Sequence, residues 1–534
     1  MTLPTTRFDF LADVPDAGAL GRVHFVAIGG AGMSGVARIM LTRGLRVSGS
    51  DAKESPLLRS LRAEGAVVHV GHDPALVRGV DTVVISSAIR DSNPELVAAR
   101  AAGLRVLHRA QALASTMTGA RRVAVAGANG KTTTTSLLTV ALQACGIDPS
   151  FAIGGELARA GTNAHLGTGD VFVVEADESD GSFLVYRPEV AVVTSVQPDH
   201  LDFYGDVATV EEAYRAFVAT IRPGGLLVAC VDDPGARDLA AHARGLGLRV
   251  LTYGESEQAD LRVSAVIHQG LTAYATLTLS QPALDPGLDP AHALSPALFG
   301  HPFALTLAVP GGHNVLNAAA AFGAAVVGLD QPPERVLEGL ASFSGTRRRF
   351  EPRGQVGGVQ VVDDYAHNPG KLSAVVSTGR RLVDDVGSGR LVVVFQPHLY
   401  SRTADFAAEL GAALALADVV VVMDVFAARE DPLPGVTGRL VADATVAAAT
   451  TLTRPPAEVH YEPSWIQVAP LVVGLARRGD LVLTVGAGDV TMIGPEILRG
   501  LADIANPAHA ANPTHPADPA HPAHPSQDAD KESR

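Results

Sequence analysis

The clearest chemical pattern in this chain is a Gly-Ala-Asn-Gly-Lys-Thr sequence that begins at Gly127 and follows an apolar run. Gly127 and Gly130 allow backbone N–H groups to turn toward phosphate oxygens, Lys131 adds a positive charge, and the Thr132 hydroxyl is a ligand for Mg²⁺. The usual form of this motif has a glycine at the position of Val125. An ordinary glycine-rich turn is the alternative, but the lysine and threonines favour nucleotide phosphate binding.

A second glycine-rich turn, Gly30–Gly35, reads Gly-Ala-Gly-Met-Ser-Gly and follows the apolar run Val23–Ile28. Asp51 comes about 20 residues later, where dinucleotide-binding folds carry the acid that binds a ribose hydroxyl. The pattern predicts a site for NAD or a sugar nucleotide. Glycines that only pack a helix against a strand are the alternative.

Two further polar segments follow apolar runs. Glu175–Asp180 contains four acids in six residues, and Asp199–Asp202 carries His200. Mg²⁺ prefers oxygen ligands and usually also binds substrate phosphates, so carboxylates suit it and Glu175 is a predicted ligand. The alternative is that the segment is a solvated acidic loop. Imidazole is not the ligand type that Mg²⁺ prefers, so His200 is either structural or contacts a metal or phosphate.

Polar segments also occur in the last two-fifths of the chain. The amides in Gly312–Asn317 could read a base edge or cap a helix, and Arg347–Arg349 suits phosphate or an exposed ion-pair face. Asp363–Pro369 and Gln396–Arg402 each contain a histidine and each follow a β-branched run. Loops of this kind at strand ends of one sheet predict a ligand site.

The elements that must position these residues are short apolar runs that alternate with alanine-rich helical stretches. This alternation predicts an α/β fold with parallel sheets covered on both faces. We expect three domains: a Rossmann-like N-terminal domain over residues 1–118, a P-loop ATPase-like central domain over 119–340, and a Rossmann-like C-terminal domain over 341–503. Residues 504–534 form a His/Pro/Ala-rich segment that we expect to be disordered, although metal binding by its histidines is an alternative. The proline-rich stretch Leu279–Pro302 predicts an irregular excursion.

Composition limits the classes of partner. The net charge of −14 argues against nucleic acid or an anionic membrane as the main partner. No run of about 18 apolar residues predicts a membrane span, and the acidic N-terminus does not resemble a signal peptide. Cys145 and Cys230 lie in apolar surroundings without metal or redox spacing, which predicts buried free thiols and a cytoplasmic protein.

The motifs together resemble those of the Mur ligases, ATP-dependent amide-forming enzymes of peptidoglycan precursor synthesis. Eight segments occur in the family's order over about residues 20–500, namely GGAGMSG, GKTTTT, EADESD, PDHLD, HNVLNA, RRF, DDYAHNP and QPHLYSR. The N-terminal GGAGMSG segment, with DDYAHNP and QPHLYSR, is similar to that of members that join L-alanine to the carboxylate of UDP-N-acetylmuramate. The resemblance therefore implies that the first domain binds the UDP-sugar, the second ATP, and the third the amino acid.

The resemblance also implies roles for individual residues, with ATP and Mg²⁺ as cofactors. The UDP-sugar site would comprise Gly30, Gly32, Met33, Ser34, Gly35, Asp51, Ser86 and Ser87. The ATP site would comprise Gly127, Asn129, Gly130, Lys131, Thr132, Thr133, His313, Asn314, Asn317 and Arg348. Mg²⁺ would be bound by Thr132, Glu175 and His200, and the amino-acid side would comprise Tyr365, His367, His398 and Arg402. Catalysis would depend on Lys131, His367, His398 and Arg402, with either histidine as acceptor of the amine proton. A monomer or weak homodimer is expected, with no nucleic acid or membrane partner.

Four residues depart from the family's usual pattern. Asn129 replaces a histidine common in alanine-adding members, Gln197 replaces a frequent glutamate, and Leu399 replaces an arginine found in some relatives. Val218 lies near the position where other ligases carry a carbamylated lysine. Three other functions remain open from the sequence: a ligase for recovered murein peptide, an NAD-dependent dehydrogenase, and an ATP-driven switch without chemistry.

Overall fold

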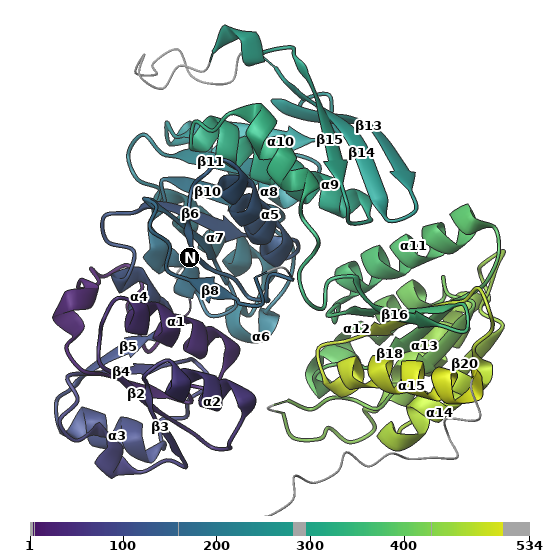
Figure 1. Ribbon diagram of the computed structural model, residues 1–534, viewed down its shortest axis with the longest axis horizontal. Helices are drawn as coiled ribbons and strands as arrows, with labels where there is room; N and C mark the ends of the chain where they lie inside the picture. The colour runs from purple at the N-terminus through teal and green to yellow at the C-terminus, as the bar shows by residue number, and fades with distance from the viewer. Residues whose placement is uncertain (1–3, 5, 159, 281–294, 429, 506–534) are drawn as a thin grey trace, which may run out of the picture.

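The computed structural model contains three α/β bodies that follow one another along the chain, each built around its own sheet (Figure 1). It describes residues 4, 6–158, 160–280, 295–428 and 430–505. The predicted three-domain α/β architecture is confirmed. Most of the expected excursion over Leu279–Pro302 and all four histidines of the C-terminal segment lie outside the described residues.

The first sheet has five parallel strands in the order β3-β2-β1-β4-β5, which is the Rossmann arrangement. Every residue of β1 is buried, because helices cover both faces of a parallel sheet. The strands are β1 (Val23–Val26), β2 (Val47–Asp51), β3 (Val67–Val70), β4 (Thr82–Ile85) and β5 (Arg105–His108). The helices are α1 (Ala31–Thr42), α2 (Pro56–Ala63), α3 (Pro94–Ala101) and α4 (Arg109–Ser115).

The second sheet has ten strands in the order β15-β14-β13-β12-β11-β10-β6-β9-β7-β8. Its centre is parallel, whereas β13, β14 and β15 form an antiparallel extension and β8 pairs antiparallel with β7. The strands are β6 (Arg121–Ala126), β7 (Ser150–Ala152), β8 (Ala164–His165), β9 (Val171–Glu175), β10 (Val190–Val193), β11 (Leu226–Cys230), β12 (Arg249–Gly254), β13 (Leu261–Gln269), β14 (Thr272–Leu279) and β15 (Pro302–Leu307). The helices are α5 (Lys131–Ala144), α6 (Leu201–Tyr204), α7 (Val207–Ala219), α8 (Pro234–Gly245), α9 (Gly312–Gly323) and α10 (Pro333–Ala341).

The third sheet has six strands in the order β16-β17-β21-β18-β19-β20, and only the β16–β17 pair is antiparallel. The strands are β16 (Glu351–Val356), β17 (Val359–Asp364), β18 (Leu391–Phe395), β19 (Val419–Val422), β20 (Glu458–Tyr461) and β21 (Leu481–Val485). The helices are α11 (Pro369–Val386), α12 (Tyr400–Leu414), α13 (Gly438–Ala449), α14 (Trp465–Leu475) and α15 (Ile493–Ala505). The two histidine-containing loops follow β17 and β18, which flank β21.

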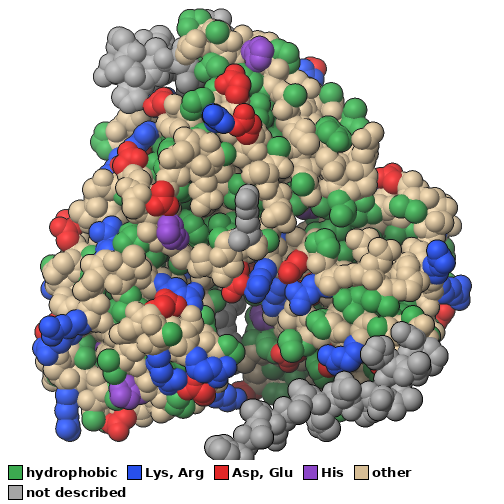
Figure 2. Space-filling view, viewed as in Figure 1, with side chains coloured by type: hydrophobic (Ala, Val, Ile, Leu, Met, Phe, Trp, Pro, Cys, Tyr) green, Lys and Arg blue, Asp and Glu red, His purple; other side chains and the backbone are tan. Residues whose placement is uncertain are grey.

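None of the helices in the described ranges is both long and apolar enough to cross a membrane. The space-filling view shows a hollow between the first and third bodies, bordered by basic and acidic side chains (Figure 2). Cys230 is buried and Cys145 half-buried, and both are free thiols.

Candidate active site

The phosphate loop joins β6 to α5, and its conformation requires glycine at two positions. Gly127 has φ +133° and Gly130 has φ +85°, which an L side chain rarely adopts. A Cβ at Gly127 would meet the Thr194 hydroxyl, and one at Gly130 would meet the Asn317 carboxamide oxygen. The loop therefore lies tightly against α9 and the segment that follows β10, with its N–H groups at the N-terminus of α5.

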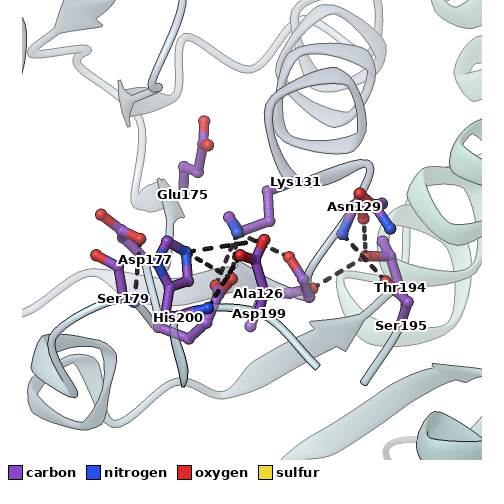
Figure 3. Close-up of polar contacts among 12 residues, drawn as sticks. Ala126, Asn129, Lys131, Glu175, Asp177, Ser179, Thr194, Ser195, Asp199 and His200 are labelled. Atoms are coloured by element: carbon purple, nitrogen blue, oxygen red, sulfur yellow. Dashed lines mark hydrogen bonds and ion pairs between the residues drawn. The ribbon is translucent and has the colours of Figure 1, made fainter. Parts of the chain in front are cut away.

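Lys131, the first residue of α5, points back across this loop. Its Nζ donates to the Gly127 carbonyl at 2.8 Å and to both oxygens of Glu178 at 2.7 Å. Burial alone would lower the pKa of Lys131, but the charges of Glu178 and Asp177 raise it above its usual value. Figure 3 shows Lys131 on the side of His200 and Asp199, while Asn129 faces Thr194 and Ser195. Lys131 is thus a fully charged ammonium held at the position expected of a phosphate ligand.

The predicted metal ligands are only partly grouped. Thr132 Oγ1 donates to Glu175 Oε1 at 2.9 Å, and the other Glu175 oxygen accepts from the Gly154 N–H at 2.6 Å. His200 Nε2 instead lies 4.0 Å from Glu178 Oε1. Within the described part of the chain, His, Cys, Asp and Glu side chains form no group of three that could hold a metal ion. One hydroxyl and one carboxylate nevertheless fit Mg²⁺, which completes its shell with water and substrate phosphates.

A cavity of about 480 Å³ extends from the phosphate loop between the second and third bodies, which is the size of a small-ligand site. Asn314 and Asn317 line it, and they are bonded to each other at 3.3 Å. His313 also lines the cavity, and burial with the charges of Arg381 and Arg349 lowers its pKa to about 4. A neutral imidazole and two amides suit an uncharged heterocycle.

The three consecutive arginines Arg347–Arg349 contact three different partners. Arg347 pairs with Glu156 at 2.8 Å, and Arg348 Nη2 donates to the Gly486 carbonyl at 2.7 Å. Arg349 lines the cavity, where its Nη2 donates to Thr132 Oγ1 at 3.2 Å. The sequence motif pointed to Arg348 as a nucleotide ligand, whereas the structure places Arg349 at the cavity and uses Arg348 to join the linker to the third body.

The residues expected on the amino-acid side lie together. The rings of His367 and His398 are 5.6 Å apart, and Tyr365 packs 5.1 Å from His367. Arg402 Nη1 lies 3.5 Å from His398 Nδ1, which can only accept from a guanidinium. His367 Nδ1 lies 2.9 Å from the Tyr365 carbonyl and must donate to it, so Nε2 carries the lone pair. Burial and the charges of Lys371 and Arg402 hold the pKa of His367 well below its usual value.

Asp199 connects this group to the phosphate-loop side. Its carboxylate accepts from Asn368 Nδ2 at 3.3 Å and from Arg402 Nη2 at 3.5 Å. Burial alone would raise the pKa of Asp199, but the charges of His200, Lys371 and Arg402 lower it to about 2. The ionised carboxylate thus joins the second body to the third.

Two of the three acids that follow Glu175 contact the first body. Asp177 pairs with Arg109 at 3.0 Å, and Asp180 accepts from the Ser87 hydroxyl at 2.5 Å and lies 3.3 Å from His108 Nε2. Burial alone would raise the pKa of Asp180, but its hydrogen bond with His108 and their charge attraction hold it well below its usual value. Sequence reasoning missed Arg109 and His108, because neither belongs to a recognisable motif.

The first glycine turn packs closely against its surroundings, and its role in binding a sugar nucleotide stays a prediction. Gly30 is the N-cap of α1, while Met33 and Ser34 are buried inside that helix. A Cβ at Gly32 would come within 2.9 Å of Arg109, so this glycine admits the arginine that binds Asp177. A Cβ at Gly35 would come within 3.0 Å of Ala164, so that position is a packing contact with the second body.

Asp51 is the last residue of β2, and Ser86 and Ser87 follow β4, so all three lie at the same edge of the first sheet as this turn. Asp51 accepts a hydrogen bond from the Gly29 N–H at 2.8 Å and so holds the turn in place. Ser86 is half-buried and Ser87 is exposed. The edge where α/β sheets bind ligands is therefore polar and partly open.

Two of the departures from the family pattern contact each other. Asn129 Nδ2 donates to Gln197 Oε1 at 2.9 Å, and Gln197 Nε2 donates to Asp233 Oδ2 at 2.9 Å. Leu399 is nearly buried with φ +68°, and Val218 is fully buried in the core. Val218 therefore faces packed side chains and has no part in the cavity.

Comparisons with known proteins agree along the whole length of the three bodies. Residues 22–121 match the profile of the Mur ligase family catalytic domain, residues 125–325 that of the Mur ligase middle domain, and residues 348–488 that of the Mur ligase glutamate ligase domain.

Individual proteins give the same result. A UDP-N-acetylmuramate–L-alanine ligase from Kineococcus radiotolerans is 53% identical over 92% of this chain and 98% of its own length. One from Saccharopolyspora erythraea is 52% identical over 90% of this chain and 93% of its own. The crystal structure of the UDP-N-acetylmuramate–alanine ligase of Thermotoga maritima superposes with a TM-score of 0.71 and 26% identity, over 90% of this chain and 99% of that one. Because the family profiles match all three bodies and these relatives share about half of the aligned residues, the chain belongs to the Mur ligase family.

Proposed function

We propose that this protein is a UDP-N-acetylmuramate–L-alanine ligase, which uses ATP to join L-alanine to the muramate carboxylate in peptidoglycan precursor synthesis. The observation that carries the proposal is the convergence of the two histidine-containing loops on Asp199, a residue of the body that carries the phosphate loop. The identity of about half of all positions with relatives of that name supports the choice of substrates. ATP and UDP-linked sugars are cytoplasmic metabolites, so the proposal includes a cytoplasmic location.

The reaction needs two steps, because a carboxylate does not react with an amine unaided. A muramate carboxylate oxygen attacks the γ-phosphorus of ATP, the bond to the β,γ-bridging oxygen breaks, and its electron pair leaves on ADP. The alanine amine then attacks the carbonyl carbon of the acyl phosphate. The bond from that carbon to the phosphate oxygen breaks, phosphate leaves with the electron pair, and the amine loses a proton.

The side chains divide these tasks between the bodies. Lys131 and the loop N–H groups bind the phosphates, and their charge stabilises the group in transfer. We assign the alanine carboxylate to Arg402, which presents a planar fork of N–H donors. His367 is the residue that we assign to the amine proton, because its Nδ1 donates to Tyr365 and its Nε2 has a free lone pair. Holding the reactants in one cavity supplies about 7–11 kcal/mol through orientation.

Mg²⁺ belongs to the same proposal, with Thr132 and Glu175 as its first protein ligands and His200 close by. Its chemistry when bound is to neutralise phosphate charge. Asn314 and Asn317 would lie beside the adenine, and the edge of the first sheet near Gly30 and Asp51 would bind the UDP-sugar.

A phosphate-release assay tests the proposed function. Phosphate and ADP should form only when UDP-N-acetylmuramate and L-alanine are both present with Mg·ATP. Turnover with UDP-N-acetylmuramate and no amino acid would contradict the ligase mechanism. A strong preference for a murein tripeptide over L-alanine as acceptor would instead identify a peptide-recovery ligase.

A further inference from the structure

Lys371 is a cation of the active-site cavity to which the reaction above gives no role. It is the third residue of α11, and its backbone N–H donates to the Asn368 side chain at 2.9 Å. Its side chain lines the cavity with Gly370, Ala374 and Val375, so one face of α11 closes the cavity opposite the phosphate loop. A Cβ at Gly370 would lie 3.6 Å from the Asn129 amide, which shows how closely α11 approaches that loop.

Three lysine or arginine side chains line the cavity, and two of them already have partners. Lys131 is bonded to Glu178, and Arg349 donates to Thr132 and lies 5.5 Å from the centre of the Tyr365 ring. For Lys371 Nζ, by contrast, the described residues provide no hydrogen bond and no ion pair within 4.0 Å. Lys371 is therefore the cation that has an unused charge in this cavity.

Charged groups of both signs surround Lys371. Burial lowers the pKa of Lys371 to about 8, and repulsion from Lys131 and Arg349 adds to this effect, while Asp199 and Glu178 oppose it. Charges of like sign that converge on one cavity are stabilised by an anion placed between them. Lys131 reaches this space from the second body and Lys371 reaches it from the third.

We propose that Lys371 is a further catalytic residue, which contacts the phosphoryl group during its transfer from ATP to the muramate carboxylate. This inference rests on the proposed function and deepens it. As the bond from the γ-phosphorus to the bridging oxygen breaks and the bond to the carboxylate oxygen forms, the Lys371 ammonium donates to the non-bridging oxygens. The same contact holds the phosphate of the acyl phosphate, whose departure completes the second step.

Three variants test this role. Lys371→Met keeps the length of the aliphatic side chain and removes the charge, whereas Lys371→Arg keeps the charge. Arg499→Ala is the control. Arg499 is exposed on α15 in the same body, so its loss changes net charge equally without touching the cavity. We expect Lys371→Met to lower kcat about 100-fold, as removal of one preorganised donor does in other active sites. Lys371→Arg should restore at least part of that loss, and Arg499→Ala should behave as the wild type.

Calorimetric binding of ATP and of ADP gives a readout that does not depend on turnover. Because Lys371 is assigned to the transferred group, Lys371→Met should weaken ATP binding about tenfold and ADP binding less than about twofold. Equal losses for the two nucleotides would overturn the assignment, as would a wild-type kcat in Lys371→Met.

The arginine variant separates charge from proton transfer. Arginine stays protonated at any working pH, so it can supply charge but cannot accept a proton. Lys371→Arg could prove as inactive as Lys371→Met while both nucleotides bind as in the wild type. That result would mean that Lys371 acts as a base, and it would overturn the proposal. If the wild type released no phosphate with both substrates present, the proposed function itself would fail. The comparison of ATP with ADP would still test Lys371 in that case.

Discussion

At the scale of single residues, the ion pair between Lys131 and Glu178 keeps a largely buried lysine charged at the proposed phosphate site. The pairing also means that a nucleotide phosphate must share or displace a carboxylate that touches the ammonium at 2.7 Å. The loop is thus preorganised in geometry, with its charge already compensated.

Removal of this ammonium tests the assignment of the second body to ATP. We expect Lys131→Ala to lower kcat by about 10³-fold, because the charge that it loses acts on the transferring group. Binding of UDP-N-acetylmuramate, measured by calorimetry without ATP, should stay unchanged, since Lys131 lies in another body from the expected sugar site. Loss of UDP-sugar binding with retained ATPase activity would show that the two substrates had been assigned to the wrong bodies.

Some residues of the candidate site could be predicted because they lie in a local sequence motif, whereas others could not. Lys131 and Thr132 could be identified because glycines, lysine and threonine lie in one short segment that folds as a unit. Arg109 is 68 residues from Asp177 in the sequence, and nothing in the sequence near either one indicates their contact. Arg348 and Arg349 show the same limit, since the sequence does not indicate that Arg348 bonds to the Gly486 carbonyl while its neighbour Arg349 lines the cavity.

At the scale of elements, α11 has a cap that also acts as a contact between bodies. Asn368 Oδ1 accepts from the Lys371 N–H at 2.9 Å, and its Nδ2 donates to Asp199 at 3.3 Å. Asn368→Ala should therefore lower the free energy of unfolding by about 1 kcal/mol and also lower kcat, because α11 carries Lys371. Denaturant unfolding and the phosphate-release assay measure the two effects.

Asn93, the N-cap of α3, offers a matched control. It accepts from the Glu95 and Leu96 N–H groups and lies in the first body, away from the cavity. Asn93→Ala should have a similar cost in stability with kcat unchanged. An equal loss of kcat in both variants would mean that activity follows stability alone, and the role of Asn368 at the cavity would be wrong.

Most parallel strands were predictable, because a strand buried on both faces is a short β-branched run, as in β10 and β18. The order of the strands in the third sheet was not predictable, since β21 lies between β17 and β18. Its first residue, Leu481, pairs with Gln360 and with Leu391, which are far away in the sequence. The antiparallel strands β13 and β14 also escaped prediction, because β14 buries only alternate residues and lacks a continuous apolar run.

At the scale of the whole molecule, Asp199 joins the second and third bodies, and its ionisation makes this junction depend on pH. A pKa lowered to about 2, from its usual value near 3.8, means that the native structure favours the carboxylate. The stabilisation is present at neutral pH and is lost as pH falls from about 4 toward 2. The shift corresponds to about 2 kcal/mol.

Asp199→Asn tests this junction. The variant should unfold more easily than the wild type by about 2 kcal/mol at neutral pH, and the difference should shrink as pH falls below about 4. Thermal or denaturant unfolding of both proteins across this range measures it. A difference that stays constant down to about pH 3 would show that the carboxylate charge does not stabilise the junction.

The acidic segment that follows β9 has a further consequence. Within six residues, Glu175 contacts Thr132, Glu178 contacts Lys131, and Asp177 and Asp180 contact the first body. A ligand that draws on any of these acids changes the position and charge felt by the others. We therefore expect occupancy of the proposed nucleotide pocket and affinity for the sugar nucleotide to be thermodynamically linked, and such a linkage is reciprocal. In this expectation, the six residues Glu175–Asp180 form the structural connection between the two binding sites.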